Sequence, residues 1–418
     1  MDIFKANSNR SQKQGFIPAR PSAWFISAAQ QLIRIQLTLK DRLQLHEKDV
    51  EILSRLPTGS GVILASNHAD ETDTRVCLEL SRRSRRSFIT MCNREAFDEM
   101  RGLAGWALQR LGYFSVERGA RDLQAKSYAI EVVRGGKHVL VVFPEGEIFY
   151  QNEQLQHFHS GAIDIGFQAI AENRKESPSW TAFVVPMVIK YHYSRSIEGE
   201  LDQRISRMEG DLSIPKSTDS LQERLLAIAT KLIQRKQAAH QLITADGVDQ
   251  NLTQEITLAK NAIFTEVELR HKQMPVSEHL PLIDRVWQLA AELRQKAKDP
   301  ADQTTRNALQ KDLDALQEVG HLASWSPRYL RGASSYDRLA ESVIKLEREL
   351  YRVKRPRPIA GRDILVTLSE PIDMARYVSD YEQDARTACR QVTQQLQEQI
   401  QELLNKLAEA SHIGPLPK

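Results

Sequence analysis

One histidine and one aspartate stand where a short apolar segment ends, and their spacing suits proton transfer. Asp73 follows His68 at the fifth position. Neutral imidazole is a competent general base near neutral pH, and a carboxylate about one helical turn away can accept a hydrogen bond from the other ring nitrogen. That bond fixes the tautomer and stabilises the imidazolium as it forms. Because no Ser or Cys nucleophile stands beside the pair, we expect His68 to deprotonate a substrate hydroxyl.

Other readings of the same residues remain open at this point. A histidine near a helix start often makes a purely structural hydrogen bond with a local carboxylate, and a short motif alone is weak. His68, Asp70 and Asp73 would suit a metal hydrolase, but no second histidine cluster at ligand spacing supports one, so we predict no metal site. The neighbouring Asp70 and Glu71 would favour imidazolium and weaken the base unless they point away.

The segments around the pair predict an α/β fold. Val62–Ala65 is an apolar run that ends just before His68, and Phe88–Met91, His138–Phe143 and Thr181–Lys190 repeat the strand pattern. Alternation of strands with helices indicates a mainly parallel sheet flanked by helices. In such sheets, chemistry is usually found where the strands end, which is where His68 falls. The predicted helices of this part are Pro21–His46, Glu95–Leu111, Asp122–Arg134 and Ser160–Glu172.

The composition of the chain changes after Tyr193, and no convincing strand follows until residue 352. Within this block, Leu225, Ile228 and Leu232 recur at helical spacing behind Ser220, which begins a capping box. A strand over Asp363–Ile372 and a long Gln-rich helix close the chain. We therefore divide it into a mobile N-terminal tail (1–20), the first part of an α/β domain (21–193), a large all-helical insertion (194–352), and a return to the α/β domain with its last strand and C-terminal helix (353–418).

Composition places further limits on function. The 418 residues are 41% hydrophobic and 27% charged, as in soluble globular proteins, and the formal net charge of +3 excludes a global polycation, so we expect no nucleic-acid partner. Three cysteines without metal or disulfide spacing fit a reducing compartment, with Cys77 as a small core residue. No run reaches the roughly 18 apolar residues of a membrane span, and no signal peptide is evident. We expect a cytoplasmic protein, peripheral to a membrane.

Two segments are candidates for that peripheral contact. Ala23–Leu39 predicts an amphipathic helix that lies in a membrane interface or packs on its own domain. The basic cluster Arg82–Arg86 suits anionic lipid headgroups or an acidic protein partner. It equally suits a solvated helix end, where cations complement the helix dipole.

Four sequence blocks follow one another in order, and together they are more specific than any one alone. They are Asn67-His68-x4-Asp73, Gly112-x-Phe114-x-Val116-x-Arg118-Gly119, Phe143-Pro144-Glu145-Gly146, and Val185-Pro186. This ordered set resembles the glycerolipid acyltransferase family, which includes the 1-acylglycerol-3-phosphate acyltransferases. The resemblance covers about residues 50–193 and resumes at residues 364–372.

The resemblance implies an O-acyltransferase of phospholipid biosynthesis. Such an enzyme moves a fatty acyl group from acyl-CoA or acyl-carrier protein directly to the hydroxyl of a lysophospholipid or glycerol-phosphate-like acceptor, with no cofactor. It implies that His68 is the general base and that Asp73 orients it. The remaining matches imply that Arg118 and Gly119 contact the phosphate of the acceptor, that Glu145 and Gly146 shape the acceptor site, and that Pro186 lies where the acyl chain packs.

One departure from the family pattern bears on the acceptor. The family usually continues Phe-Pro-Glu-Gly with Thr-Arg, whereas this chain has Glu147-Ile148, so one cationic phosphate contact is missing. The alternative function is a catalytically altered or inactive lipid-binding or scaffolding homologue that uses the helical insertion to bind partners. The presence of both His68 and Asp73 favours catalysis, since an inactive homologue has no chemical reason to keep the pair.

Overall fold

The computed structural model describes residues 15–39, 41–240, 252–272, 279–298, 300–333 and 335–411. The chain forms two compact units. The α/β unit consists of the described residues up to Glu117, Arg121–His192 and Arg362–Ser411, and the helical unit consists of Arg118–Ala120 and Tyr193–Gly361.

The α/β unit is built on one mixed, mainly parallel sheet, which confirms the predicted fold class. Among the described residues, eight strands take part: β1 (Arg42–Leu45), β2 (Gly61–Ser66), β3 (Ser87–Asn93), β4 (Tyr113–Val116), β5 (His138–Val142), β6 (Ala182–His192), β7 (Asp363–Leu368) and β8 (Ile372–Asp373). The order is β1-β7-β6-β2-β5-β3-β4, with β8 also paired to β6. Only the pairings of β6 with β7 and with β8 are antiparallel.

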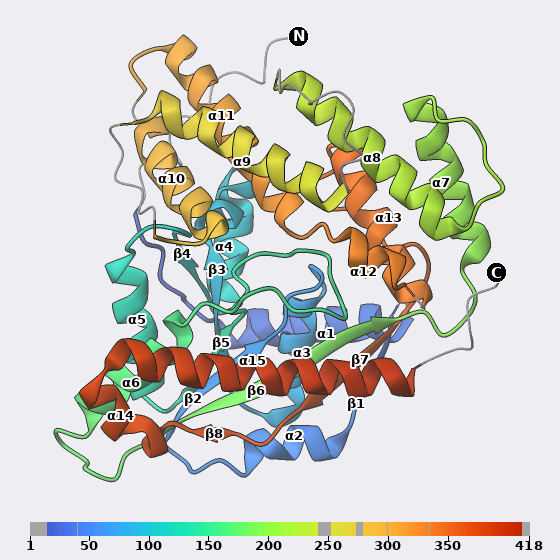
Figure 1. The fold of residues 1–418 in the computed structure, drawn as a ribbon. Coiled ribbons are helices and arrows are strands. Elements are labelled where there is room, and N and C mark those ends of the chain that lie inside the picture. The colour runs from blue at the N-terminus through green and yellow to red at the C-terminus, as the bar shows by residue number, and fades with distance from the viewer. Residues whose placement is uncertain are drawn as a thin grey trace. The chain divides into compact units, whose positions relative to one another are not determined.

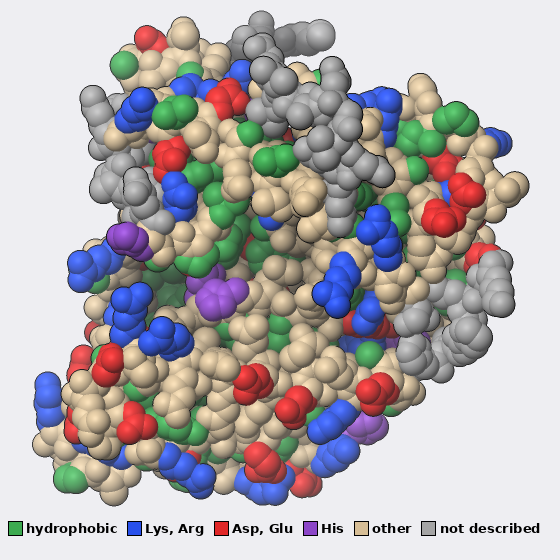
Figure 2. Space-filling view, in the orientation of Figure 1, with side chains coloured by type: hydrophobic (Ala, Val, Ile, Leu, Met, Phe, Trp, Pro, Cys, Tyr) green, Lys and Arg blue, Asp and Glu red, His purple; other side chains and the backbone are tan. Residues whose placement is uncertain are grey.

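Helices cover both faces of the sheet, so its central strands are apolar on both sides. One layer contains α5 (Leu123–Arg134), α6 (Gly161–Asn173) and α15 (Ala385–Ala410), and the other contains α1 (Ala23–Leu39), α2 (Glu47–Ser54) and α3 (Asp73–Ser84). Along β2, Ile63 packs in the first layer and Leu64 in the second, as strand alternation requires. Figure 1 shows α15 lying across the sheet, and on that face Lys and Arg side chains are interspersed with Asp and Glu (Figure 2).

The helical unit contains the described part of the predicted insertion. Its helices are α7 (Glu198–Leu212), α8 (Leu221–Ala239), α9 (Leu252–Arg270), α10 (Leu282–Ala297), α11 (Gln303–Ala323), α12 (Pro327–Arg331) and α13 (Tyr336–Tyr351). The side chain of Ser220 accepts the backbone N–H of Glu223 and caps α8, as the capping-box pattern predicts. Leu225, Ile228 and Leu232 are buried.

Two predicted helices need correction, and the strand predicted over Asp363–Ile372 is interrupted between β7 and β8. The helix predicted over Pro21–His46 ends at Leu39, and Arg42–Leu45 forms an edge strand because β7, distant in sequence, pairs with it. The helix predicted over Glu95–Leu111 begins as two 3₁₀ turns, η1 (Arg94–Phe97) and η2 (Glu99–Gly102), and only α4 (Leu103–Arg110) is α-helical. The left-handed backbone of Met100 and Arg101, with φ of 51° and 59°, interrupts the helix.

The prediction of a mobile tail over residues 1–20 also needs correction where the structure describes it. Residues 1–14 of it lie outside the described residues, whereas residues 15–20 pack on the sheet. Ile17 donates its N–H to Ser115 Oγ at 2.8 Å and accepts the N–H of Ser115 at 2.9 Å. Phe16 contacts the rings of Phe114 and Tyr128, so apolar side chains hold this stretch against β4 and α5.

Buried polar side chains fasten the long β5–α6 connection to β6. The Asn152 side chain donates to the carbonyl of Tyr191 at 2.6 Å and accepts its N–H at 2.7 Å, so it replaces a neighbouring strand. One residue further along, Glu153 forms a 2.8 Å ion pair with Lys190, and both side chains are buried. These contacts fix the end of β6 and the β5–α6 connection relative to each other.

Replacing Lys190 with Met should therefore destabilise the protein. The substitution leaves Glu153 buried without its cationic partner, and breaking a buried ion pair in this way costs about 3–5 kcal/mol. Urea unfolding of the full chain measures the change. The double variant Lys190→Met/Glu153→Gln serves as the control and should recover much of the loss, because no charge is stranded. A single variant as stable as the wild type would show that the pair does not fasten the connection.

Candidate active site

The sheet topology brings four separate segments to one edge. Strand β2 pairs in parallel with both β5 and β6, so the carboxyl ends of all three strands lie at the same edge. Because β7 runs antiparallel to β6, with His192 opposite Asp363, the amino end of β7 reaches the same edge. His68 follows β2, Glu145 follows β5, Tyr191 lies at the end of β6, and Arg362 immediately precedes β7.

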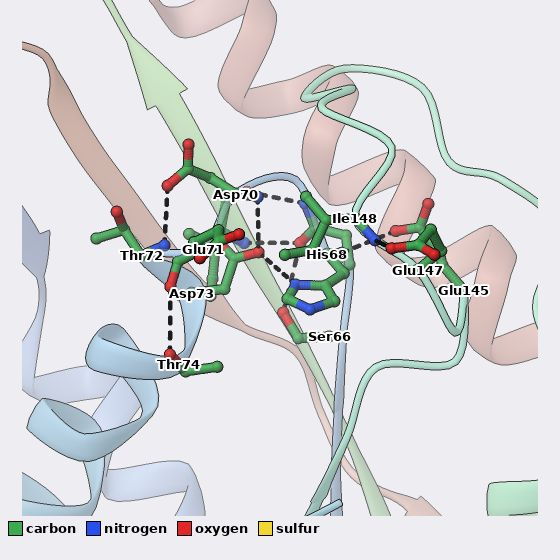
Figure 3. Close-up of polar contacts among 12 residues, drawn as sticks. Ser66, His68, Asp70, Glu71, Thr72, Asp73, Thr74, Glu145, Glu147 and Ile148 are labelled. Carbon is green, nitrogen blue, oxygen red and sulfur yellow. Dashed lines mark hydrogen bonds and ion pairs between the residues drawn. The ribbon is translucent and has the colours of Figure 1, made fainter. Parts of the chain in front are cut away.

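The structure brings His68 and Asp73 into direct contact (Figure 3). Nδ1 of His68 lies 2.8 Å from Oδ2 of Asp73, which is the first residue of α3 and is fully buried. Because an ionised carboxylate only accepts hydrogen bonds, the neutral imidazole carries its proton on Nδ1 and keeps Nε2 as an acceptor. Burial raises the pKa of Asp73, against the opposing effect of the His68 hydrogen bond. This geometry would allow His68 to act as a general base that a carboxylate orients.

The histidine is also held by its ring face and by its backbone. The imidazole stacks on Phe143 with ring centroids 4.0 Å apart and planes 16° apart. The backbone N–H of His68 donates to Glu145 Oε1 at 2.8 Å. Asn67 extends the sheet by bonding both backbone groups of Ile189 at 2.9 Å. His68 is therefore fixed in position while 14% of its side chain stays exposed.

Glu145 owes its position to a tight turn. Gly146 donates its N–H to the carbonyl of Phe143 at 2.9 Å, with Pro144 second in the turn and Gly146 fourth at φ 72°. The other carboxylate oxygen accepts the N–H of Gln156 at 3.0 Å. Both oxygens of Glu145 thus bind backbone, so this residue joins the His68 loop to the β5–α6 connection. Burial raises the pKa of Glu145 to about 7 although both N–H donors oppose the shift.

Sequence reasoning missed Tyr191 and Arg362. The Tyr191 hydroxyl donates to Asp73 Oδ1 at 2.5 Å, and Arg362 forms a 2.9 Å ion pair with Asp70 while stacking 3.9 Å from the centre of the Tyr191 ring. Burial alone would raise the pKa of Asp70, but the charge of Arg362 and hydrogen bonds from Arg362 and Thr72 outweigh it and lower that pKa. The Asp70 carboxylate is therefore bound to Arg362 rather than directed at His68.

The remaining predicted site residues have different surroundings. Arg118 and Gly119 belong to the helical unit, where the Arg118 guanidinium lies 6.0 Å from the Trp287 ring centre. A Cβ at Gly119 would meet the Trp287 carbonyl at 2.1 Å, so a protein backbone, rather than the expected substrate, makes the close approach. Pro186 lies inside β6 opposite Ala65, between the residues that pair with β7 and those that pair with β8. Proline has no backbone N–H to donate, and this is tolerated at the break between the pairing with β7 and the pairing with β8.

An α/β sheet with a histidine–aspartate pair at its carboxyl edge is the arrangement that the comparison with family models addresses. Residues 48–190 match the Acyltransferase family model. This part of the chain, which includes β2 to β6 and the His68–Asp73 pair, is similar to the glycerolipid acyltransferase family. No curated protein matches the chain significantly. Within the described part of the chain, no helix is both long and apolar enough to cross a membrane.

The raised pKa of Glu145 predicts a pH-dependent contribution to stability. Between its ordinary pKa of 4.5 and about 7, the folded protein holds a proton that the unfolded chain has released. The contribution is therefore fully present below pH 4.5 and is lost as the pH rises through 7, and it corresponds to about 3 kcal/mol. Glu145→Gln removes this titration. In urea unfolding, the stability of the wild type relative to the variant should fall from about pH 4 to about pH 8. A relative stability that stays constant over this range would contradict the assignment.

Proposed function

We propose that the protein is an O-acyltransferase that moves a fatty acyl group from acyl-CoA or acyl-carrier protein to the hydroxyl of a lysophospholipid or glycerol-phosphate-like acceptor. The 2.8 Å contact between His68 and buried Asp73, within the segment that matches the family, is the observation that carries the proposal. The bound backbone N–H of His68 and the stacking on Phe143 add to it, because a general base must be held in place.

In this mechanism Nε2 of His68 takes the proton of the acceptor hydroxyl as the oxygen attacks the thioester carbonyl. The tetrahedral intermediate then collapses, the C–S bond breaks, and the imidazolium returns the proton to the departing thiolate. Asp73 stabilises the imidazolium in between. Direct transfer is favoured because Cys77, on α3, is fully buried and its burial raises the thiol pKa, which leaves it unreactive as a nucleophile.

The proposal predicts that activity depends on both members of the pair. Acyl transfer from radiolabelled acyl-CoA and acyl-carrier protein to a panel of lysophospholipids, glycerol 3-phosphate and monoacylglycerol would be measured for each variant. His68→Ala should lower kcat by at least about 100-fold, and Asp73→Asn by at least about tenfold, because each removes part of the base.

His138→Ala provides the matched control, since His138 lies at the opposite end of β5 and bonds Ser87. It should leave kcat unchanged. Absence of product with every donor and acceptor, together with equal lipid binding by wild type and His68→Ala, would overturn the enzymatic proposal and favour the lipid-binding or scaffolding alternative. The acceptor with the highest kcat/KM would show what Glu147-Ile148 selects.

We further propose that α1 makes the peripheral membrane contact. Large apolar side chains that are 47–82% exposed gather on α1, η2 and α4, and we call them the α1–α4 surface: Trp24, Leu32, Ile35, Leu39, Met100, Leu103 and Trp106. Phe25 and Trp106 join the two helices through ring centroids 5.3 Å apart. The only charged residue within α1 is Arg34, so the helix carries no acidic group that would repel anionic lipid.

The basic cluster Arg82–Arg86 is less suited to this contact. Arg82 pairs with Glu79, Arg83 bonds the Leu45 carbonyl and Glu47, and Arg86 bonds the Leu56 carbonyl. These arginines therefore already bind protein groups around the end of α3.

Charged substitutions on α1 should weaken vesicle binding. Leu32→Glu/Leu39→Glu places two carboxylates on the α1–α4 surface, and its binding to phosphatidylglycerol–phosphatidylcholine vesicles in sedimentation should fall by at least about tenfold. Leu258→Glu, at a 53% exposed leucine of α9, serves as the control and should bind like the wild type. Equal binding by the wild type and the double variant would show that α1 does not contact the membrane.

A further inference from the structure

Asp73 is held from two sides, and the second side lies outside the four sequence blocks. His68 and the backbone N–H of Asp70 bind Oδ2, at 2.8 and 3.0 Å. Oδ1 faces β6, where it accepts the Tyr191 hydroxyl at 2.5 Å. Burial and the neighbouring carboxylates raise the pKa of Tyr191 well above its ordinary value, so the phenol keeps its proton and acts as a donor.

Arg362 fixes the tyrosine in turn. Its guanidinium stacks 3.9 Å from the centre of the Tyr191 ring and pairs with Asp70 at 2.9 Å, while Asp41 lies 3.9 Å from its Nε. All four side chains are buried. A buried cation between two carboxylates and an aromatic face has little freedom to move. The arginine therefore both locks the ring of Tyr191 and neutralises the Asp70 carboxylate, whose charge acts on Asp73.

We propose that Tyr191 and Arg362 are positioning residues of the active site, which orient Asp73 and set the proton affinity of the His68–Asp73 pair. The inference deepens the proposed function and rests on it for its catalytic meaning. Neither side chain is assigned to substrate. Tyr191 acts through Asp73, and Arg362 acts through Tyr191 and Asp70.

The expected direction of the change in the apparent pKa follows from the protonation state of the pair that each contact stabilises. A hydrogen bond to Asp73 is strongest when the carboxylate is ionised beside a neutral imidazole, and it weakens once the pair has gained a proton. Removing the Tyr191 hydroxyl should therefore raise the apparent pKa of the pair. Among the described residues, the other titratable or charged groups around the pair include Asp70 and Glu71 in the loop after β2, Cys77 on α3, Glu145 after β5, and Arg362 before β7. All of them remain in a Tyr191→Phe variant, so the shift reports the lost hydroxyl.

NMR of protein labelled with ¹³C in its histidines provides a test that does not depend on turnover. His68→Asn identifies the His68 signal, whose titration gives the apparent pKa of the pair, and long-range ¹H–¹⁵N spectra identify the tautomer. Tyr191→Phe should raise that apparent pKa by about one unit. Tyr113→Phe is the matched control, because Tyr113 is equally buried but its hydroxyl faces the Thr74 carbonyl, and it should leave the titration unchanged. An unchanged titration in Tyr191→Phe would overturn the proposal.

A second set of variants tests the charge on Arg362. Arg362→Gln exposes the pair to the Asp70 carboxylate, so it should also raise the apparent pKa, whereas Arg362→Gln/Asp70→Asn removes both charges and should return it toward the wild-type value. If the double variant stays as shifted as the single one, Arg362 does not act by neutralising Asp70.

Kinetics then separate this inference from the proposed function. With an active acyl donor and acceptor, Tyr191→Phe should lower kcat by about tenfold with little change in KM, and the acidic limb of the pH profile should move to higher pH. A merely structural defect would lower activity without moving that limb. If the wild type transfers no acyl group, the proposed function fails, while the NMR titrations still decide whether Tyr191 and Arg362 position the pair.

Discussion

The buried carboxylate of Asp73 is the constraint on which the rest of the site depends. An ionised group removed from water is stable only if hydrogen-bond donors replace its hydration. The donors come from the His68 ring, the backbone of Asp70 and the Tyr191 hydroxyl, that is, from the loop after β2 and from the end of β6. The pairing of β2 with β6 brings these donors together. The stabilisation of the Asp73 carboxylate therefore depends on the order of the strands.

The antiparallel pairing of β7 with β6 has a second consequence. In a purely parallel sheet, the residue before β7 would lie at the opposite edge from His68. Here Arg362 reaches the edge of the site and pairs with Asp70. Asp70, the additional carboxylate beside His68, is thus paired with Arg362, which follows the helical unit in the sequence. The α/β unit needs both halves of its sequence to complete the surroundings of the pair.

The residues of the third sequence block, Phe143-Pro144-Glu145-Gly146, mainly make contacts with the protein backbone. Pro144 and Gly146 form a turn that directs Glu145 at two backbone N–H groups, one of which belongs to His68. Asn67 and Asn152 likewise bond strand β6 as if they were backbone. These bonds hold the loops after β2 and β5 in place, and the proposed general base would need such a rigid frame to act on a hydroxyl in a single orientation.

The sequence by itself determined the features that depend on local spacing. The apolar runs of β2, β5 and β6, the His68–Asp73 separation, the helical block and the ordered motifs were all visible in it, and from these the fold class and the family followed. Edge strand β1, the interrupted helix before α4 and the packing of residues 15–20 were not visible, because each depends on a partner distant in the chain or on a left-handed backbone. The contacts of Tyr191, Arg362 and Glu145 around the pair were decided only by the tertiary structure. Their meaning depends on which strand ends share an edge, and strand order and direction are long-range properties that no local pattern of residues encodes.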